Sequence, residues 1–182
     1  MRIQGATVHL RTLALIDVNK THLDTRQDVE ITQDLECRIS DKARRSLILF
    51  SIVMNDGGHY VGNIKIGPVS PKHGIANVSV RIGDEGYWKK GIATEAIRLA
   101  TRYAFSYLTL RRLTAAASTN DVAAVRAHEE AGFQIEGIRK TQSRSNGTHE
   151  DWAFMGMVAA DWSAQLPLTL PIHRPAAEYL AA

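Results

Sequence analysis

Residues 87–96, with the sequence YWKKGIATEA, place small side chains next to positive charge at the start of a helical pattern. A helix N-terminus carries backbone N–H groups without internal partners and a partial positive charge, so it is a natural binding site for phosphate. Gly91 and Ala93 would let phosphate oxygens approach the main chain, with the two lysines adding attraction and Thr94 a hydroxyl donor. A tight strand-to-helix turn with solvated lysines explains the same residues equally well, since short glycine motifs often occur by chance.

The elements that hold this stretch follow from the hydrophobic pattern. Residues 75–82 alternate with a two-residue period, which predicts a strand with one buried face. Residues 92–107 repeat apolar side chains every three or four positions, which predicts a helix. Residues 47–55 and 59–69 predict an antiparallel hairpin, because an Asp-Gly-Gly turn signal joins them. The candidate phosphate-binding stretch therefore lies where a strand passes into a helix.

The remaining pattern completes an α+β domain. It predicts a strand near 7–11, helices at 11–24 and 33–45, a strand at 113–118, a helix at 121–131 ended by Gly132, and strands at 133–140 and 152–158 around a Ser-Asn-Gly turn. The central strand–helix–strand order implies a right-handed parallel crossover, and hence a mixed sheet. We expect a domain over residues 1–160 and a proline-bearing arm or tail over 161–182. Alternating apolar residues at 166–172 predict an added strand on a second subunit, and so a homodimer.

Composition limits the class of protein. The 182 residues suit one domain, and 45% hydrophobic with 23% charged residues is typical of a globular chain. The 22 basic and 19 acidic residues leave a formal charge of +3, which predicts no nucleic-acid partner but leaves a local polyanion site open. Without an apolar run near about 20 residues or a signal-peptide pattern, we expect no membrane partner and a cytoplasmic location.

Several catalytic classes lack their sequence patterns. The seven histidines are scattered without metal-ligand spacing such as H-x-x-x-H, so we expect no metal. Neither a GxSxG elbow nor a GxxxxGK[ST] phosphate loop occurs, which argues against serine hydrolases and nucleotide hydrolases. The single cysteine, Cys37, cannot form an internal disulfide. The chemistry therefore has to be sought near the stretch 87–96.

This stretch and the later NDVAAVRAHEEAGF at 120–133 together resemble the GCN5-related N-acetyltransferases (GNAT), over about residues 7–158. Within them the chain resembles the branch of the ribosomal-protein alanine acetyltransferases and related small-molecule acetyltransferases. In that family a Q/R-x-x-G-x-G/A signature holds the pyrophosphate of acetyl-coenzyme A (acetyl-CoA). Here it falls on Trp88, Lys89, Lys90, Gly91, Ile92 and Ala93. Trp88 replaces Gln or Arg, and Lys89 replaces a glycine usual in the branch, so its side chain must point away from the cofactor.

The resemblance implies a fold and a cofactor. The fold is a mixed, mostly antiparallel twisted sheet of six to seven strands flanked by about four helices, with a parallel splay at the central strands. The backbone from Val80 to Ile82 would line the pantetheine and donate an N–H to the thioester oxygen. A family asparagine that contacts coenzyme A falls on Asp121, one position after Asn120. Asn120 is our candidate for that contact, although both residues suit a helix N-cap equally well.

Acetyl transfer from a thioester to an amine requires a neutral amine, a polarised carbonyl and a proton for the leaving thiolate. Many family members carry a tyrosine five residues before the Gly-Phe pair, and His128 in that slot is the candidate general acid. The alternative is that it is an ordinary polar or packing residue of the helix. Asp151 at the start of the last strand is the candidate base, or it simply faces water.

These residues and departures lead to one functional hypothesis with two alternatives. We expect an acetyl-CoA-dependent N-acetyltransferase that acts by direct attack of a primary amine, on a small molecule such as an amino sugar. Asn77 stands where the family often has an acidic residue, and Ala124 where the ribosomal branch has a serine. The alternatives are therefore a protein N-terminal acetyltransferase and a non-catalytic acetyl-CoA-binding module.

Overall fold

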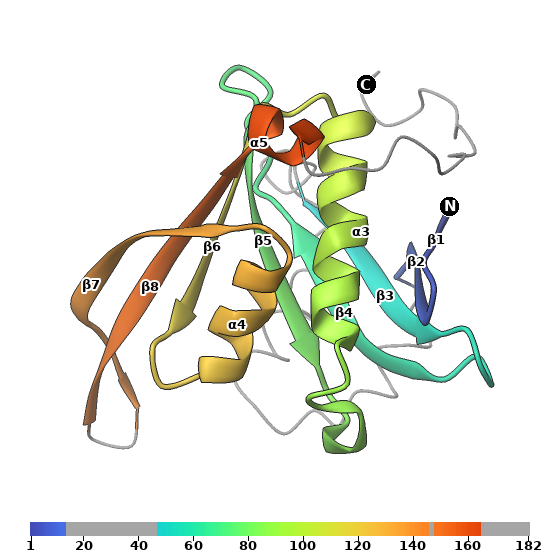
Figure 1. Cartoon of the computed structure of the whole chain (residues 1–182), viewed down its shortest axis with the longest axis horizontal. Helices are drawn as coiled ribbons and strands as arrows, with labels where there is room; N and C mark the ends of the chain where they lie inside the picture. The colour runs from blue at the N-terminus through green and yellow to red at the C-terminus, as the bar shows by residue number, and fades with distance from the viewer. Residues whose placement is uncertain (14–46, 146–147, 165–182) are drawn as a thin grey trace, which may run out of the picture.

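The computed structural model describes residues 1–13, 47–145 and 148–164 of the chain. The helix predicted at 33–45, most of the helix predicted at 11–24, and the tail from residue 165 lie outside the described residues. The described part forms one sheet with helices packed on it (Figure 1).

The sheet has eight strands in the order β1-β2-β3-β4-β5-β6-β8-β7. Their bounds are Arg2–Gln4 (β1), Val8–Thr12 (β2), Ile48–Met54 (β3), Tyr60–Ile66 (β4), Ile75–Ile82 (β5), Arg112–Ser118 (β6), Gln134–Ser145 (β7) and Thr148–Val158 (β8). Every neighbouring pair is antiparallel except β5 and β6, which run parallel. The predicted α+β class and mixed sheet are confirmed, with one strand more than expected because β1 was not predicted.

Three α-helices and one 3-10 turn join the strands in the described part. They are η2 (Glu85–Tyr87), α3 (Ile92–Ser106), α4 (Val122–Glu130) and α5 (Ala159–Ala164). Figure 1 shows α3 and α4 side by side on one face of the sheet. Their apolar sides enter the main core, where Ile97 and Ala127 belong to the same buried cluster as Leu113 of β6. None of the described helices is long and apolar enough to cross a membrane.

The parallel pair separates soon after it begins. Only three register pairs join β5 to β6, from Ile75 with Arg112 to Asn77 with Thr114. Beyond them β5 continues to Ile82 and β6 to Ser118, and Figure 1 shows the two strands diverging toward the N-terminal end of α3. This is the parallel splay that the family resemblance implied.

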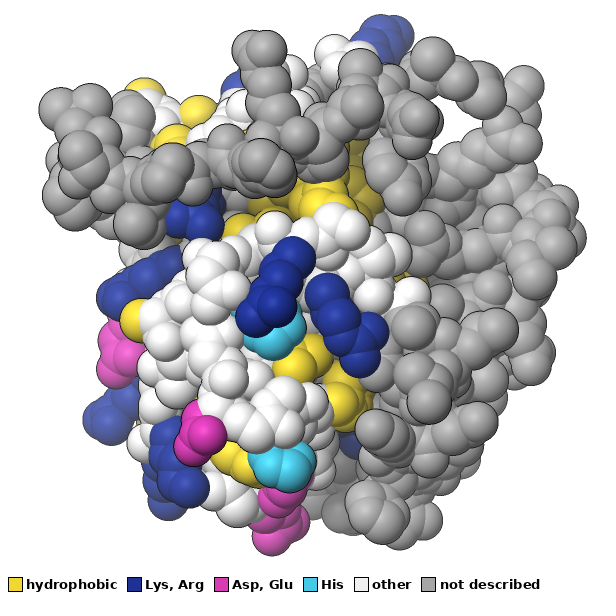
Figure 2. Space-filling view, turned by 90° about the vertical axis from the view of Figure 1, so that its right-hand side faces the viewer, with side chains coloured by type: hydrophobic (Ala, Val, Ile, Leu, Met, Phe, Trp, Pro, Cys, Tyr) yellow, Lys and Arg dark blue, Asp and Glu magenta, His cyan; other side chains and the backbone are white. Residues whose placement is uncertain are grey.

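The N-terminal hairpin β1–β2 holds α3 against the sheet. The backbone N–H of Thr7 donates to both carboxylate oxygens of Glu95, at 2.9 and 3.3 Å, and Arg102 donates to the carbonyl of Gln4 at 3.1 Å. Figure 2 shows this side of the molecule, where basic side chains lie around a histidine. The helix predicted at 11–24 starts too early, because residues 11 and 12 pair with β3.

Helices α4 and α5 lie where the sequence predicts a helix end and a domain boundary, respectively. After α4, Gly132 has φ 104°, and the N–H groups of Gly132 and Phe133 donate to the carbonyls of Glu129 and His128. This Schellman arrangement confirms the predicted glycine stop. The helix α5 spans residue 160, and its Trp162 packs against Phe105 at a ring-centroid distance of 5.4 Å. The domain boundary expected at that residue stays a prediction.

Candidate active site

The loop before α3 and the first turn of that helix contain a run of main-chain donors. Within the described part of the chain, the amide N–H groups of residues 89–94 have no hydrogen-bond partner, and Gly91 as N-cap provides no side-chain cap. Lys89 has φ 59° and Gly91 has φ 74°, so the loop turns twice through the left-handed region. Such successive N–H groups form a concave seat for an anion, which the dipole of α3 reinforces. The left-handed φ of Lys89 also explains why the branch prefers glycine there.

The side chains around this loop are largely committed to the protein itself. The indole N–H of Trp88 donates to the carbonyl of Ile82 at 3.1 Å, although the ring is half exposed. The ammonium of Lys90 lies 5.4 Å from the ring centroid of Tyr87. The Thr94 hydroxyl, predicted as a phosphate donor, instead donates to the Glu130 carboxylate at 3.1 Å. The binding capacity of the loop therefore resides in its backbone.

The edge of β5 that faces the splay carries unpaired main-chain groups. The Asn77 carbonyl accepts from Gly67, and the Gly83 N–H donates to Val61, so odd-numbered residues of β5 direct their main chain toward β4. Because alternate residues of a strand direct their main chain to opposite sides, Val80 and Ile82 present theirs to the splay, where the Ile82 carbonyl accepts the Trp88 indole N–H. The ladder with β6 has already ended there. These groups can pair with an extended ligand in the manner of an added strand.

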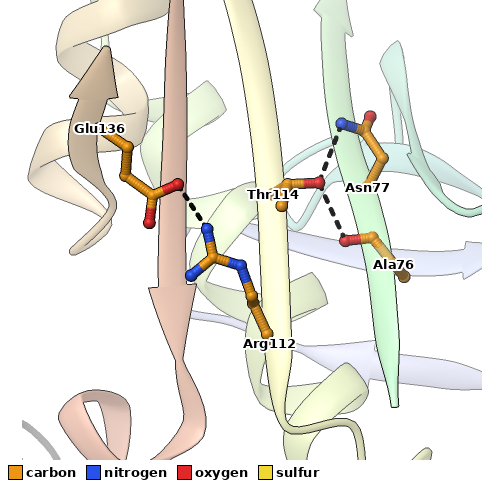
Figure 3. A network of polar contacts seen from close by, with 5 residues as sticks. All are labelled: Ala76, Asn77, Arg112, Thr114 and Glu136. Atoms are coloured by element: carbon orange, nitrogen blue, oxygen red, sulfur yellow. Dashed lines mark hydrogen bonds and ion pairs between the residues drawn. The ribbon is translucent and has the colours of Figure 1, made fainter. Parts of the chain in front are cut away.

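Polar side chains close the narrow end of the splay (Figure 3). The Asn77 amide donates to the Thr114 hydroxyl at 3.5 Å, and that hydroxyl donates to the Ala76 carbonyl at 3.4 Å. Next to them Arg112 is ion-paired with Glu136. Asn77 thus ties the two strands together at their last common pair, which gives a structural role to the position where the family often has an acid.

His128, the predicted general acid, is buried in α4 with 3% of its surface exposed. Its Nδ1 lies 2.8 Å from the Ala124 carbonyl, which can only accept, so Nδ1 carries the proton. Nε2 is buried without a partner among the described residues. Burial lowers the pKa of His128 below its ordinary value, outweighing the Ala124 carbonyl and Asp121, which raise it. The imidazole is therefore neutral at physiological pH, and its Nε2 is an acceptor.

Asp151, the predicted base, is hydrogen-bonded to a bulge in the last hairpin. The pairing of β7 with β8 shifts between Arg139 and Ser143, and Thr141 in this bulge has φ 49°. The Thr141 N–H donates to the Asp151 carboxylate at 2.9 Å, and Lys140 lies 3.5 Å from its other oxygen. The Thr141 hydrogen bond, with a smaller contribution from Lys140, lowers the pKa of Asp151, which weakens it as a base.

Two neighbouring polar residues at the start of α4 make different contacts. Asp121 is the N-cap, with its carboxylate accepting the Ala124 N–H at 3.0 Å. The Asn120 N–H donates to the Ser118 hydroxyl at 3.3 Å, and the side chain is exposed at the end of β6. Asn120, rather than Asp121, is therefore the residue with a side chain available to a ligand. Among the described residues no group of three or more His, Cys, Asp or Glu side chains could hold a metal.

Two features of the site carried no signal in the sequence. The hydrogen bond from Trp88 to Ile82 ties the loop to the end of β5, and the Asp151 contact with Thr141 shapes the hairpin. Both join a side chain to a backbone group whose position only the folded chain defines. An aromatic residue or a carboxylate next to a turn is too common to have predicted either contact.

Fold and site together define a mixed α+β domain with an anion-binding helix start beside a splayed parallel pair. The family profile of the acetyltransferase (GNAT) domain matches residues 9–134. Because this match covers more than half of the chain, the protein belongs to the GNAT acetyltransferase family. The family resemblance stated from residues 87–96 and 120–133 is thereby confirmed.

Relatives and solved structures agree with this membership. The protein named "Probable N-acetyltransferase YjcK" of Bacillus subtilis (strain 168) is 37% identical over 78 residues, 43% of each chain. Spermidine N(1)-acetyltransferase of Escherichia coli (strain K12) is 26% identical over 123 residues, 68% of this chain and 63% of that protein. Spermidine N-acetyltransferase from Vibrio cholerae in complex with CoA and spermine has a TM-score of 0.74 at 20% identity, covering 87% of this chain and 99% of that chain. The chain spans between 43% and 58% of the length of the first curated relatives that it matches.

Proposed function

We propose that the protein is an acetyl-CoA-dependent N-acetyltransferase that acetylates the primary amine of a small molecule such as an amino sugar. The observation that carries the proposal is the run of unpartnered N–H groups at residues 89–94, together with the splay-facing edge of β5, which has no strand partner beyond Asn77. The first feature suits a pyrophosphate and the second suits an extended amide-containing arm. Family membership supports the acetyl donor, and a CoA complex is known for a protein of the same fold.

In the proposed reaction the amine nitrogen attacks the thioester carbonyl carbon directly. The carbon–sulfur bond breaks, the sulfur leaves as thiolate, and the proton lost by the amine neutralises it. The main-chain N–H of Val80 or Ile82 on the free edge of β5 would polarise the carbonyl. The residues of the loop at 88–93 would hold the pyrophosphate through their backbone, with Asn120 contacting the carrier from the end of β6.

The acid and base expected from the sequence are not part of this proposal. A neutral His128 with its proton on the helix-bonded Nδ1 has none to give from Nε2. The Asp151 carboxylate is hydrogen-bonded within the bulge and has a lowered pKa. The proposal therefore routes the proton from the amine to the leaving sulfur without either side chain. An acceptor whose amine is partly neutral at physiological pH is favoured by such a site.

A second candidate acceptor comes from the relatives rather than from the structure. Two of the proteins compared above are named as spermidine acetyltransferases, and one of these was solved with spermine. A polyamine is also a small primary amine, so it fits the general proposal. The two acceptor classes differ in charge, because a polyamine carries several ammonium groups and an amino sugar only one.

The direct test is release of free CoA thiol from acetyl-CoA in the presence of an amine panel. The panel contains D-glucosamine, spermidine and a peptide with a free N-terminus, with mass spectrometry of the products. We expect amine-dependent thiol release with at least one small amine and a product heavier by one acetyl group. Binding of acetyl-CoA without thiol release from any amine would contradict the enzyme and identify a binding module. Acetylation of the peptide alone would replace the acceptor class with a protein N-terminus.

The expected homodimer is part of the same proposal. Its predicted contact, the alternating apolar residues 166–172, lies outside the described residues. Because Trp162 packs in the domain, the matched truncation ends after Ala164 and keeps α5. Sedimentation should show dimers for the full chain and monomers for the truncated one, and equal mass for both would contradict the contact.

A further inference from the structure

Among the described residues, helices cover only one face of the sheet beside the splay. Leu113, Ala115 and Ala117 of β6 are buried on the face covered by α3 and α4. A carrier lying along the free edge of β5 is therefore shielded on that side by helices. No described helix covers the opposite face, which we call the acceptor face, so an amine that approaches from there would meet the side chains of that face.

The acceptor face near the splay carries several uncharged polar side chains. By register, Ala116 lies beside Phe154 and Ser118 beside Trp152, and all four are half-buried. Alternation places a further set of small polar side chains on the same face of β5 and β6, namely Asn77, Ser79 and Thr114. Neutral hydroxyl and amide groups beside aromatic rings suit a hydroxyl-bearing ligand, which can exchange hydrogen bonds and place its C–H groups on the rings.

The charges on this face do not suit a polycation. Across β4–β8 its described charged residues are Lys65, Arg81, Arg112, Arg139, Glu136 and Glu150, four positive and two negative, a surplus of 4 − 2 = 2 positive charges. Glu136 is already paired with Arg112, and Glu150 accepts the Ser143 hydroxyl at 3.3 Å. Both carboxylates therefore already have partners. A second ammonium group of the ligand would have to displace one of these partners, at a cost in free energy.

Arg139 occupies the aromatic surface that an ammonium group would seek. Its guanidinium carbon lies 4.3 Å from the ring centroid of Phe154, and its register partner on β8 is Trp152. Cations bind aromatic faces, so this arginine both fills the Phe154 face and repels a second positive charge near it. The Trp152 indole N–H is held by the Ser143 hydroxyl at 2.8 Å, which fixes the second ring.

Building on the proposed function, we propose that the acceptor face selects a hydroxyl-bearing monoamine over a polyamine, with Arg139 as the specificity-determining residue. Electronegative hydroxyl neighbours also lower the pKa of an amine, so this acceptor class supplies the neutral nucleophile that the site does not generate itself.

The test compares kcat/KM for D-glucosamine and spermidine within single preparations of the wild type, Arg139→Gln and Arg139→Glu. The ratio of the two values cancels any loss of folded enzyme, so a destabilised variant remains informative. Lys72→Glu is the matched charge-reversal control, because Lys72 is exposed in the turn between β4 and β5, away from the last hairpin.

We expect the wild type to favour D-glucosamine by at least about tenfold. Arg139→Glu should move the ratio toward spermidine by about tenfold and Arg139→Gln by about threefold, while Lys72→Glu leaves it unchanged. A wild type that favours spermidine, or an Arg139→Glu ratio equal to that of the wild type, would overturn the inference. Absence of thiol release with every amine would instead contradict the proposed function.

Discussion

The two edges of strand β5 differ in how far they are paired with neighbouring strands. Toward β4 the strand has a ladder of five register pairs, from Gly62 with Ile82 to Ile66 with Val78. Toward β6 it has three pairs and no strand partner beyond Asn77, and the Ile82 carbonyl accepts the Trp88 indole N–H instead. The paired edge fixes the strand in the sheet, and the other edge precedes the loop and helix start where, among the described residues, the N–H groups of residues 89–94 have no partner.

The difference shows where the binding capacity of the site is located. Side chains that sequence reasoning assigned to chemistry, His128 and Asp151, are held by hydrogen bonds to nearby backbone groups. Among the described residues, the main-chain N–H groups of residues 89–94 are left without partners. A substitution can remove or block a main-chain donor only by introducing proline or an obstructing side chain. Such substitutions distinguish the contribution of each edge to stability from its contribution to binding.

The largest effect is expected from Gly62→Ala on the paired edge. A Cβ at Gly62 would overlap the carbonyl oxygen of Arg81 and approach Ile82 Cα to 3.0 Å, so the two backbones would have to separate. We expect a loss of about 3 kcal/mol or more in the free energy of unfolding, measured by urea denaturation. Gly83→Ala is the matched control, because a Cβ there meets nothing within 4 Å. Equal stability of both variants would contradict the tight paired edge.

Proline substitutions at neighbouring positions of β5 separate the edges next. Ser79→Pro removes an N–H that faces β4, whereas Val80→Pro removes one that faces the splay. We expect Ser79→Pro to lose about 3 kcal/mol or more of stability, and Val80→Pro about 1 kcal/mol. Val80→Pro should nevertheless bind acetyl-CoA at least about tenfold more weakly in calorimetry. Unimpaired binding by a folded Val80→Pro variant would remove the free edge from the proposed site.

A smaller, pH-dependent effect is expected from His128→Leu. The folded pKa of His128 lies below its ordinary value of 6.5, so below pH 6.5 the unfolded chain binds the proton more readily than the folded chain. Wild-type stability should therefore fall on acidification through this window, by at most about 1.4 kcal/mol per pH unit from this group. The variant should show a flatter profile between pH 5 and 7. Parallel profiles of the two proteins would show that His128 is not neutralised by burial.

The smallest effect is expected from Lys89→Gly. Lys89 adopts φ 59°, which costs a residue with a side chain about 1 kcal/mol and costs glycine little. We expect stability to change by less than about 1 kcal/mol and acetyl-CoA affinity by only about threefold, because the backbone N–H remains and one positive charge is lost. A loss of affinity comparable to that of Val80→Pro would show that the lysine side chain carries the binding.

Much of the framework could be predicted from local patterns. The alternation in β5, the three-and-four spacing in α3 and the stop at Gly132 each have a cause within a few residues, and each is confirmed. The polar end of β7 beyond Lys140 was not predicted as a strand, because it is held by pairing with β8 rather than by its own composition. The three-residue β1 was missed for the same reason.

In the candidate site, too, local features were predictable and long-range contacts were not. Gly91 and Ala93 predicted an accessible backbone, and the structure places unpartnered N–H groups there. The partners of Trp88, Thr94 and Asp151 lie between 6 and 36 residues away in the chain, so spacing could not reveal that these side chains were already engaged. Residue types thus indicated where the backbone is accessible. Which side chains are free to act could not be predicted, because that depends on tertiary contacts.

The central claim is that main-chain donors at residues 89–94 seat the pyrophosphate of acetyl-CoA. Isothermal titration calorimetry of acetyl-CoA against the wild type, Ala93→Glu and Ala123→Glu tests it most directly. Both alanines lie in the first turn of a helix, in α3 and α4 respectively, and Ala123 is exposed. We predict micromolar-range binding by the wild type and Ala123→Glu, and at least about a 100-fold loss in Ala93→Glu, where a carboxylate would occupy the anion seat. Equal affinity of all three proteins, or no heat with the wild type, would contradict the account.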